Sequence, residues 1–177
     1  VRKGVNIPSF IFGGGQEKGF RSGTENVPFI VGLGLAAKMA EEERKTKLEH
    51  LKAMRTKLLT GIESTIENAV INSPREEKAS PAILNVSFPG CRGEVLLHML
   101  EQKDIYVSTG SACSSHKKGS HVLTAAGLKP EEIEGALRLS LSCDITEEQV
   151  DYALKELKFA VDSMRRLTKM MGRGKKR

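Results

Sequence analysis

The sequence predicts an α+β domain in which helices cover one face of a small β-sheet. Two patterns support this fold class. Apolar residues recur at spacings of three and four near the C-terminus, which is typical of an amphipathic helix. Leu137, Leu139 and Leu141 alternate with polar residues, as in a strand that is buried on one side. Because helical segments are interspersed with a few short strands, both types belong to one domain.

The N-terminal elements are expected to be a strand, a glycine-rich loop and a long helix. Residues 10–12 are apolar and predict a strand that runs into a loop through Ser22. Asn26 or Thr24 can cap a helix, and Pro28 is suited to its first turn. The buried stripe of this helix is expected to contain Leu51, Met54, Leu58 and Ile62.

The remaining elements are short until the last one. Thr146 begins the sequence Thr-Glu-Glu-Gln, which is a capping box and predicts the start of a long helix. Further strands are predicted at residues 83–88, 105–107 and 137–141, and short helices at residues 93–102 and 121–126. The apolar stripe of the last helix consists of Val150, Leu154, Leu157, Val161 and Met164.

Composition excludes several classes of function. The chain has 177 residues, of which 39% are hydrophobic and 28% charged, as in a soluble globular protein. No apolar run approaches the roughly 20 residues of a membrane-spanning helix. The three cysteines are too far apart for paired zinc ligands or a dense disulfide framework, so a reducing, cytoplasmic location is expected.

The net charge of +6 is a property of the C-terminal residues. No acidic or aromatic residue lies among the basic ones there, and the rest of the chain is close to neutral. A solvated tail is therefore favoured over a nucleic-acid-binding arm, and neither a nucleic acid nor a membrane is expected as a partner. The tail contains Arg165, Arg166, Lys169, Arg173, Lys175, Lys176 and Arg177.

One cysteine lies among small polar residues, in the sequence Val107-Ser-Thr-Gly-Ser-Ala-Cys113-Ser-Ser-His-Lys-Lys-Gly119. Cysteine is usually buried, so this setting predicts that the Cys113 thiol is exposed. Nearby histidines and lysines favour its thiolate form, which is the nucleophile. An ordinary surface cysteine is the alternative interpretation.

Two further parts of the sequence contain residues that the formation of a hydrophobic core does not explain. Glycines in residues 13–24 allow backbone amides to approach a ligand, and Arg21, Ser22 and Thr24 can contact an anion such as phosphate. A mobile loop without a ligand explains the same residues. Arg138 lies between leucines on a predicted strand, where it is either an exposed or ion-paired residue or a bidentate ligand of a carboxylate.

Four motifs resemble those of the cysteine desulfurases, and they occur in the family's order. These enzymes are fold-type-I proteins that use pyridoxal 5'-phosphate to convert cysteine to alanine and retain the sulfur as a persulfide. The resemblance covers nearly the whole chain and implies a short, mainly antiparallel sheet covered by helices, with a long linking helix. The motifs are Gly13-Gly-Gly-Gln-Glu-Lys-Gly-Phe-Arg-Ser-Gly-Thr-Glu-Asn, Ile83-Leu-Asn-Val-Ser-Phe, Ser108-Thr-Gly-Ser-Ala-Cys-Ser-Ser and Leu137-Arg-Leu-Ser-Leu.

The resemblance implies a role for three residues. Cys113 falls at the family's nucleophilic cysteine, and Arg138 at its ligand for the substrate's α-carboxylate. Thr24 matches a threonine that contacts the cofactor phosphate of the partner subunit in family dimers, so a homodimer is implied. The stretch after Cys113 resembles the longer cysteine loop of the subgroup that delivers sulfur to a scaffold protein for iron-sulfur cluster assembly.

The resemblance also implies that the chain is a C-terminal half. Residues 1–26 would be the end of the large cofactor domain, and residues 27–177 the linking helix and the small C-terminal domain. The family's Schiff-base lysine would lie before Val1, so the chain alone is expected to be inactive. Lys117 is part of a similar Ser-x-His-Lys sequence, but its position directly after the nucleophile is wrong for that role.

Several alternatives stay open at this point. Selenocysteine lyase is a related enzyme that acts on the selenium analogue of cysteine with the same residues. A non-catalytic carrier that accepts sulfur on Cys113 is a possibility of another class. A zinc site is disfavoured because Cys113, His116 and His121 would need a fourth ligand. Structural or incidental roles are expected for Cys91 and Cys143, and surface or packing roles for His50 and His98.

Overall fold

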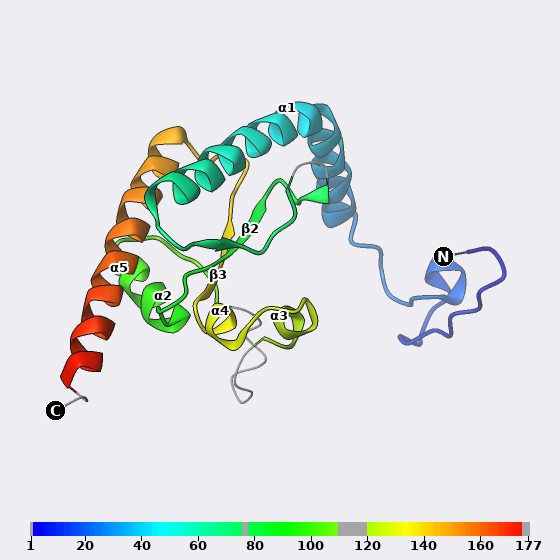
Figure 1. The fold of residues 1–177 in the computed structure, drawn as a ribbon. Coiled ribbons are helices and arrows are strands. Elements are labelled where there is room, and N and C mark those ends of the chain that lie inside the picture. The colour runs from blue at the N-terminus through cyan, green and yellow to red at the C-terminus, as the bar shows by residue number, and fades with distance from the viewer. Residues whose placement is uncertain (1, 76–77, 110–119, 175–177) are drawn as a thin grey trace. The chain divides into compact units, whose positions relative to one another are not determined.

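The computed structural model describes residues 2–75, 78–109 and 120–174, with side chains through Met170. Figure 1 shows the elements in chain order. The helices are η1 (Gln16–Gly19), α1 (Val27–Thr65), α2 (Gly93–Glu101), α3 (His121–Ala125), α4 (Pro130–Glu134) and α5 (Glu147–Gly174), and the strands are β1 (Val70–Ile71), β2 (Ile83–Ser87) and β3 (Ala136–Ser140).

The chain divides into two compact units, residues 1–45 and residues 46–177. The division falls within α1, so this helix contributes residues to both units. The domain boundary expected at residues 26 and 27 remains a prediction. No helix in the described ranges is both long enough and apolar enough to cross a membrane.

The second unit contains a three-stranded antiparallel sheet in the order β1-β2-β3. In β2 and β3, Leu84 lies opposite Leu139 and Val86 opposite Leu137. Helices α1, α2 and α5 pack against the face that carries these four side chains, and Figure 1 shows β2 and β3 side by side. The α+β class and the helix-covered antiparallel sheet are thus confirmed.

The core forms between this sheet face and the expected helical stripes. Ile62 of α1 and Val161 of α5 have no exposed surface, and Leu154 is partly buried beside Gly61. A Cβ atom on Gly61 would overlap the Leu154 side chain, so the glycine permits the two helices to approach closely. The core residues from these helices are Met54, Leu58, Ile62, Val150, Leu157, Ala160, Val161 and Met164.

Both long helices begin as the sequence predicts. Asn26 Oδ1 accepts a hydrogen bond from the N–H of Phe29 at 3.3 Å, which caps α1. Thr146 and Gln149 exchange hydrogen bonds of 2.9 and 3.3 Å at the start of α5, and these form the expected capping box. The two caps fix where the helices start.

Two predicted strands are wrong. Residues 10–12 form no strand because the first unit offers them no strand to pair with, and Phe10 and Phe12 are exposed. Residues 105–107 approach β3 only through an isolated bridge between Ser108 and Arg138. Strand propensity alone does not make a strand without a partner for its backbone groups.

Two arginines have structural roles that the sequence did not indicate. Arg55 is buried and donates to the carbonyl groups of Ile83 at 3.2 Å and Pro74 at 2.9 Å. Arg165 donates to the carbonyl groups of Glu67 at 2.6 Å and Pro89 at 3.3 Å. The expectation that the basic C-terminal residues are all solvated is therefore wrong for Arg165.

Candidate functional site

Arg138 lies at the centre of β3, on the face of the sheet opposite the core. Its neighbours Leu137 and Leu139 are buried, whereas Arg138 itself is exposed. This alternation confirms the expected placement of the side chains on the two faces. The guanidinium group makes no hydrogen bond or ion pair with the described residues, so its donors are available to a ligand. A guanidinium on a rigid strand is suited to bidentate binding of a carboxylate.

A hydrogen-bonded network of polar side chains lies next to Arg138 on the sheet. Asn85 of β2 lies directly opposite Arg138, and its Oδ1 accepts a hydrogen bond of 2.7 Å from Asn72 Nδ2. Asn72 Nδ2 also donates to Ser87 Oγ at 2.7 Å. Sequence reasoning missed this network. The available signal was the alternation of the polar Asn85 and Ser87 with the apolar Leu84 and Val86 in β2, which assigns both polar residues to the face opposite the core.

The glycine-rich loop of residues 13–24 is held by its own side chains. Ser22 is buried, and its hydroxyl donates to the carbonyl of Gly14 at 2.6 Å. The N–H of Gly23 donates to Gln16 Oε1 at 3.2 Å. Arg21 donates to the carbonyl groups of Gly23 and Thr24, each at 3.2 Å. The loop therefore has a defined internal bonding pattern, and both Arg21 and Ser22 take part in it.

Thr24 is exposed, like most residues of this loop. Its carbonyl is engaged by Arg21, while its hydroxyl and its N–H have no partner in the described parts of the chain. Hydroxyl and backbone N–H groups are donors that can bind phosphate oxygens. The donor set at Thr24 therefore fits the phosphate of a cofactor such as pyridoxal 5'-phosphate. Both donors of Thr24 belong to the first unit, residues 1–45.

Cys113 lies outside the described residues, as do His116 and Lys117. The structure consequently leaves the predicted nucleophile as a prediction. Segments on either side of it are described. Ser108 pairs with Arg138 through backbone hydrogen bonds of 2.6 and 3.1 Å, and Ser120 caps α3 by accepting from the N–H of Leu123. Five residues before Cys113, the chain is thus bonded directly to the strand that carries Arg138.

The other two cysteines differ in their surroundings. Cys91 is buried in the core, and burial raises the pKa of its thiol above the ordinary value, although Arg165 opposes this shift. A neutral, buried thiol is a poor nucleophile, which agrees with the structural or incidental role expected for Cys91. Cys143 is partly exposed in the loop between β3 and α5.

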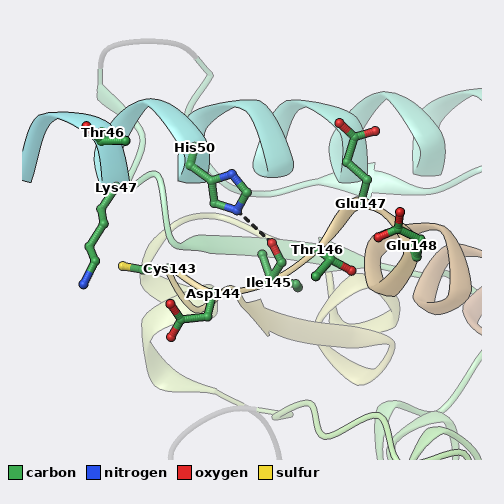
Figure 2. Close-up of a pocket in the computed structure, with 9 residues that line it drawn as sticks. All are labelled: Thr46, Lys47, His50, Cys143, Asp144, Ile145, Thr146, Glu147 and Glu148. Carbon is green, nitrogen blue, oxygen red and sulfur yellow. Dashed lines mark hydrogen bonds between the residues drawn. The ribbon is translucent and has the colours of Figure 1, made fainter. Parts of the chain in front are cut away.

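Cys143 borders a shallow cavity of about 530 Å³, which Figure 2 shows. His50 of α1 contributes to the same cavity, and its Nε2 atom forms a hydrogen bond of 2.7 Å with the carbonyl of Ile145. His50 thus packs against the loop, as expected for a packing residue. Where side chains are described, no group of three or more His, Cys, Asp or Glu residues could hold a metal ion. The cavity lining is Thr46, Lys47, His50, Cys143, Asp144, Ile145, Thr146, Glu147 and Glu148.

The structure described so far is an α+β domain with an exposed arginine, Arg138, on the face of its sheet opposite the core. Residues 8–153 match the family model described as aminotransferase class-V. The chain belongs to the aminotransferase class-V family.

Curated relatives within this family have specific names. The chain is 42% identical over 170 residues to a cysteine desulfurase IscS of Clostridium botulinum (strain Hall / ATCC 3502 / NCTC 13319 / Type A), with 95% of this chain and 43% of the relative covered. It is 41% identical over 174 residues to cysteine desulfurase IscS 1 of Archaeoglobus fulgidus, with 98% and 45% covered. The resemblance to cysteine desulfurases is thereby confirmed. The chain spans less than half the length of these relatives.

Solved structures agree with this assignment. One neighbour, described as a NifS-like protein, has a TM-score of 0.76 and 41% identity, and the match covers 92% of this chain and 41% of that one. A NifS-like protein from Rickettsia africae ESF-5 has a TM-score of 0.72 and 29% identity, with 89% and 41% covered. The fold described above corresponds to less than half of each of these neighbours.

Proposed function

We propose that this chain acts as the C-terminal part of a cysteine desulfurase, which takes sulfur from L-cysteine and leaves L-alanine. The observation that supports this most directly is the exposed, unengaged guanidinium of Arg138 on a strand backed by the core. An amino-acid substrate has an α-carboxylate, which matches the planar donor fork of a guanidinium. Arg138 would hold this carboxylate and so orient the substrate.

Cys113 would be the sulfur acceptor in this reaction. Its thiolate attacks the sulfur of cysteine, a sulfur–sulfur bond forms, and the bond between substrate sulfur and its β-carbon breaks. The carbon gains a proton to give alanine, and Cys113 keeps the sulfur as a persulfide. Ser108, five residues before this cysteine, is bonded through its backbone to Arg138 of β3, which supports a common site for the two residues.

Pyridoxal 5'-phosphate would supply an electron sink for the substrate's carbon chemistry. Thr24 would contribute its hydroxyl and its N–H to the phosphate, in agreement with the unused donors described above. By the family resemblance, this contact would be made across a homodimer. The lysine that holds the cofactor would come from a part of the polypeptide that is not in this sequence.

The persulfide would be passed to an acceptor such as a scaffold protein for iron-sulfur clusters. The 177-residue chain alone would not complete the reaction, because by the family resemblance the cofactor lysine would come from outside it. Intact-protein mass spectrometry after mixing the chain with cysteine and pyridoxal 5'-phosphate tests this. We expect no reductant-sensitive sulfur on Cys113. A cofactor-dependent sulfur adduct would contradict the expectation.

Substitution within the complete desulfurase that carries this chain tests the roles of the residues. Cys113→Ser should reduce alanine formation at least about 1000-fold, because no thiolate receives the sulfur. Cys143→Ser is the matched control and should keep most of the activity. Iodoacetamide at neutral pH should label Cys113 faster than the buried Cys91. Equal loss of activity in Cys113→Ser and Cys143→Ser would contradict the proposed role of Cys113. If the complete protein turned over selenocysteine but not cysteine, selenocysteine lyase would be favoured instead.

A further inference from the structure

The polar face of the sheet contains a row of four residues on neighbouring segments. Asn72 directly follows β1, and its N–H donates to the carbonyl of Asn85 at 2.9 Å. Asn85 lies opposite Arg138, and Arg138 pairs with Ser108. Side chains in such a row lie on the same face of the sheet, so Asn85 is the cross-strand neighbour of Arg138.

Asn85 and Arg138 form the closer of the two kinds of antiparallel pair. The backbone N–H and carbonyl of Arg138 bond to Ser108 at 2.6 and 3.1 Å. Those of Asn85 bond to Ser73 Oγ at 2.8 Å and to the N–H of Asn72 at 2.9 Å, on the opposite side. The two residues therefore form a non-hydrogen-bonded pair, with Cα atoms about 4.5 Å apart and side chains close together.

Asn72 fixes the orientation of the Asn85 amide. Both amide hydrogens of Asn72 are used, one on Asn85 Oδ1 and the other on Ser87 Oγ. Since β1 and β3 lie on opposite sides of β2, an Oδ1 that faces Asn72 leaves the Nδ2 group facing Arg138. The Nδ2 group has no acceptor within the described ranges.

We propose that Asn85 is a positioning residue that keeps the guanidinium of Arg138 available to a substrate carboxylate. A guanidinium group has five donors and no acceptor, so it cannot bond to the N–H groups that Asn85 presents. An acceptor at the same place would hold the guanidinium against the sheet and compete with the substrate. The inference rests on the proposed role of Arg138 and adds the residue that protects it.

The main test introduces an acceptor at position 85 of the complete desulfurase. Asn85→Asp should form a cross-strand pair with Arg138 and raise the KM for L-cysteine about fivefold, while kcat changes by less than about twofold. Asn85→Ala presents neither donor nor acceptor and should raise KM by only about twofold. An unchanged KM in Asn85→Asp, or a larger rise in Asn85→Ala than in Asn85→Asp, would overturn the proposal.

A second variant changes the orientation of the amide without changing Asn85. Asn72→Asp leaves only acceptors at position 72, so Asn85 should turn its N–H groups toward Asp and its oxygen toward Arg138. The KM should then rise about twofold to threefold. Asn72→Leu, which offers no acceptor, should give a smaller rise. Equal effects of the two substitutions would mean that the orientation of the amide is irrelevant.

An independent readout separates this inference from the proposed function. Nuclear magnetic resonance of arginine side chains in the 177-residue chain reports whether the Arg138 Nε–H is hydrogen-bonded. We expect rapid solvent exchange in the native chain and slower exchange with a shifted resonance in Asn85→Asp. A protected Nε–H in the native chain would refute the inference. Failure of the complete protein to release sulfur from cysteine would refute the proposed function instead, and the resonance would still decide the role of Asn85.

Discussion

The two parts of helix α1 have opposite surroundings. From residue 46 onward the helix contributes Leu51, Met54, Leu58 and Ile62 to the core, and Ile62 has no exposed surface. From residue 27 to residue 45 no side chain is buried, although this part contains a continuous apolar run. Phe29 and Leu33 are 77% and 72% exposed. Both parts are helical, so the difference lies in packing partners rather than in local structure.

The two parts of α1 also differ in their sequence patterns. The later part has an apolar stripe with charged residues between, which is typical of a helix packed on one side. Residues 27–37 of the earlier part contain no charged residue and are apolar all round, a pattern that suits a helix surrounded by protein. Apolar surface of this extent favours association, so the isolated chain is expected to self-associate through residues 27–39.

The largest difference should appear when one leucine-sized side chain is shortened in each part. Ile62→Ala removes buried methyl groups and leaves a cavity, so it should lower the free energy of unfolding by about 2–5 kcal/mol. Leu33→Ala, in the exposed part, should change it by less than about 0.5 kcal/mol. Urea denaturation followed by circular dichroism measures both. Similar effects of the two substitutions would mean that Leu33 is packed in solution.

A larger side chain at a packed glycine should have an intermediate effect on the free energy of unfolding. Gly61→Ala places a methyl group against the Leu154 side chain and should lower the free energy of unfolding by about 1–3 kcal/mol. The Leu154→Ala background should remove most of this cost, because the two residues share one contact. A double-mutant cycle in urea measures the coupling. Additive effects would show that the two helices do not meet at Gly61.

The corresponding substitution in the exposed part should have the opposite sign. A methyl group at Gly32 meets no atom within 4 Å. Glycine is more flexible than alanine in the unfolded chain, so it loses more conformational entropy when the helix forms. Gly32→Ala should therefore raise the free energy of unfolding by about 0.4–1 kcal/mol. Loss of stability in the same urea experiment would indicate that this part of the helix is packed against protein.

The smallest effect is expected at the surface contact between α1 and α5. Lys57 Nζ lies 2.9 Å from Asp151 and 3.1 Å from Glu147, and hydrogen bonds to these carboxylates raise its pKa. A raised pKa means that the contribution is complete below the ordinary pKa of 10.5 and is lost as pH rises through the folded-state value. Lys57→Met should lower the Tm slightly at pH 7, and the difference should disappear at high pH or high salt. A difference that persists in both conditions would contradict an electrostatic origin.

Elements with strong local signals could be predicted from the sequence. Helix α5 has both a capping box and an apolar stripe, and β3 has an alternating pattern, so each is specified by neighbouring residues. The strands expected at residues 10–12 and 105–107 had only apolar composition as evidence. Whether such a segment becomes a strand depends on a partner strand, which composition does not supply. Strand β1, of two residues, was missed for the same reason.

The candidate site was predictable to a similar extent. Arg138 could be assigned because a cation between two leucines of a strand must lie on the face away from the core. The contribution of Asn85 could not be assigned, because it depends on the register between β2 and β3 and on a contact with Asn72, which follows the neighbouring strand β1. Arg165 looked like part of a charged tail, and only the fold brings Pro89 and Glu67 within its reach.

The approach of Gly135 to the end of β2 restricts how this protein can evolve. Gly135 accepts a hydrogen bond from the N–H of Phe88 at 3.0 Å, and any Cβ atom at this position would overlap the carbonyl oxygen of Phe88. The overlap is with backbone, which cannot move aside as a flexible side chain can. Every substitution at position 135 would push apart the strands that align Arg138 with Asn85. Homologues that retain this strand pairing should therefore vary freely at the exposed positions of α4 but retain glycine immediately after it.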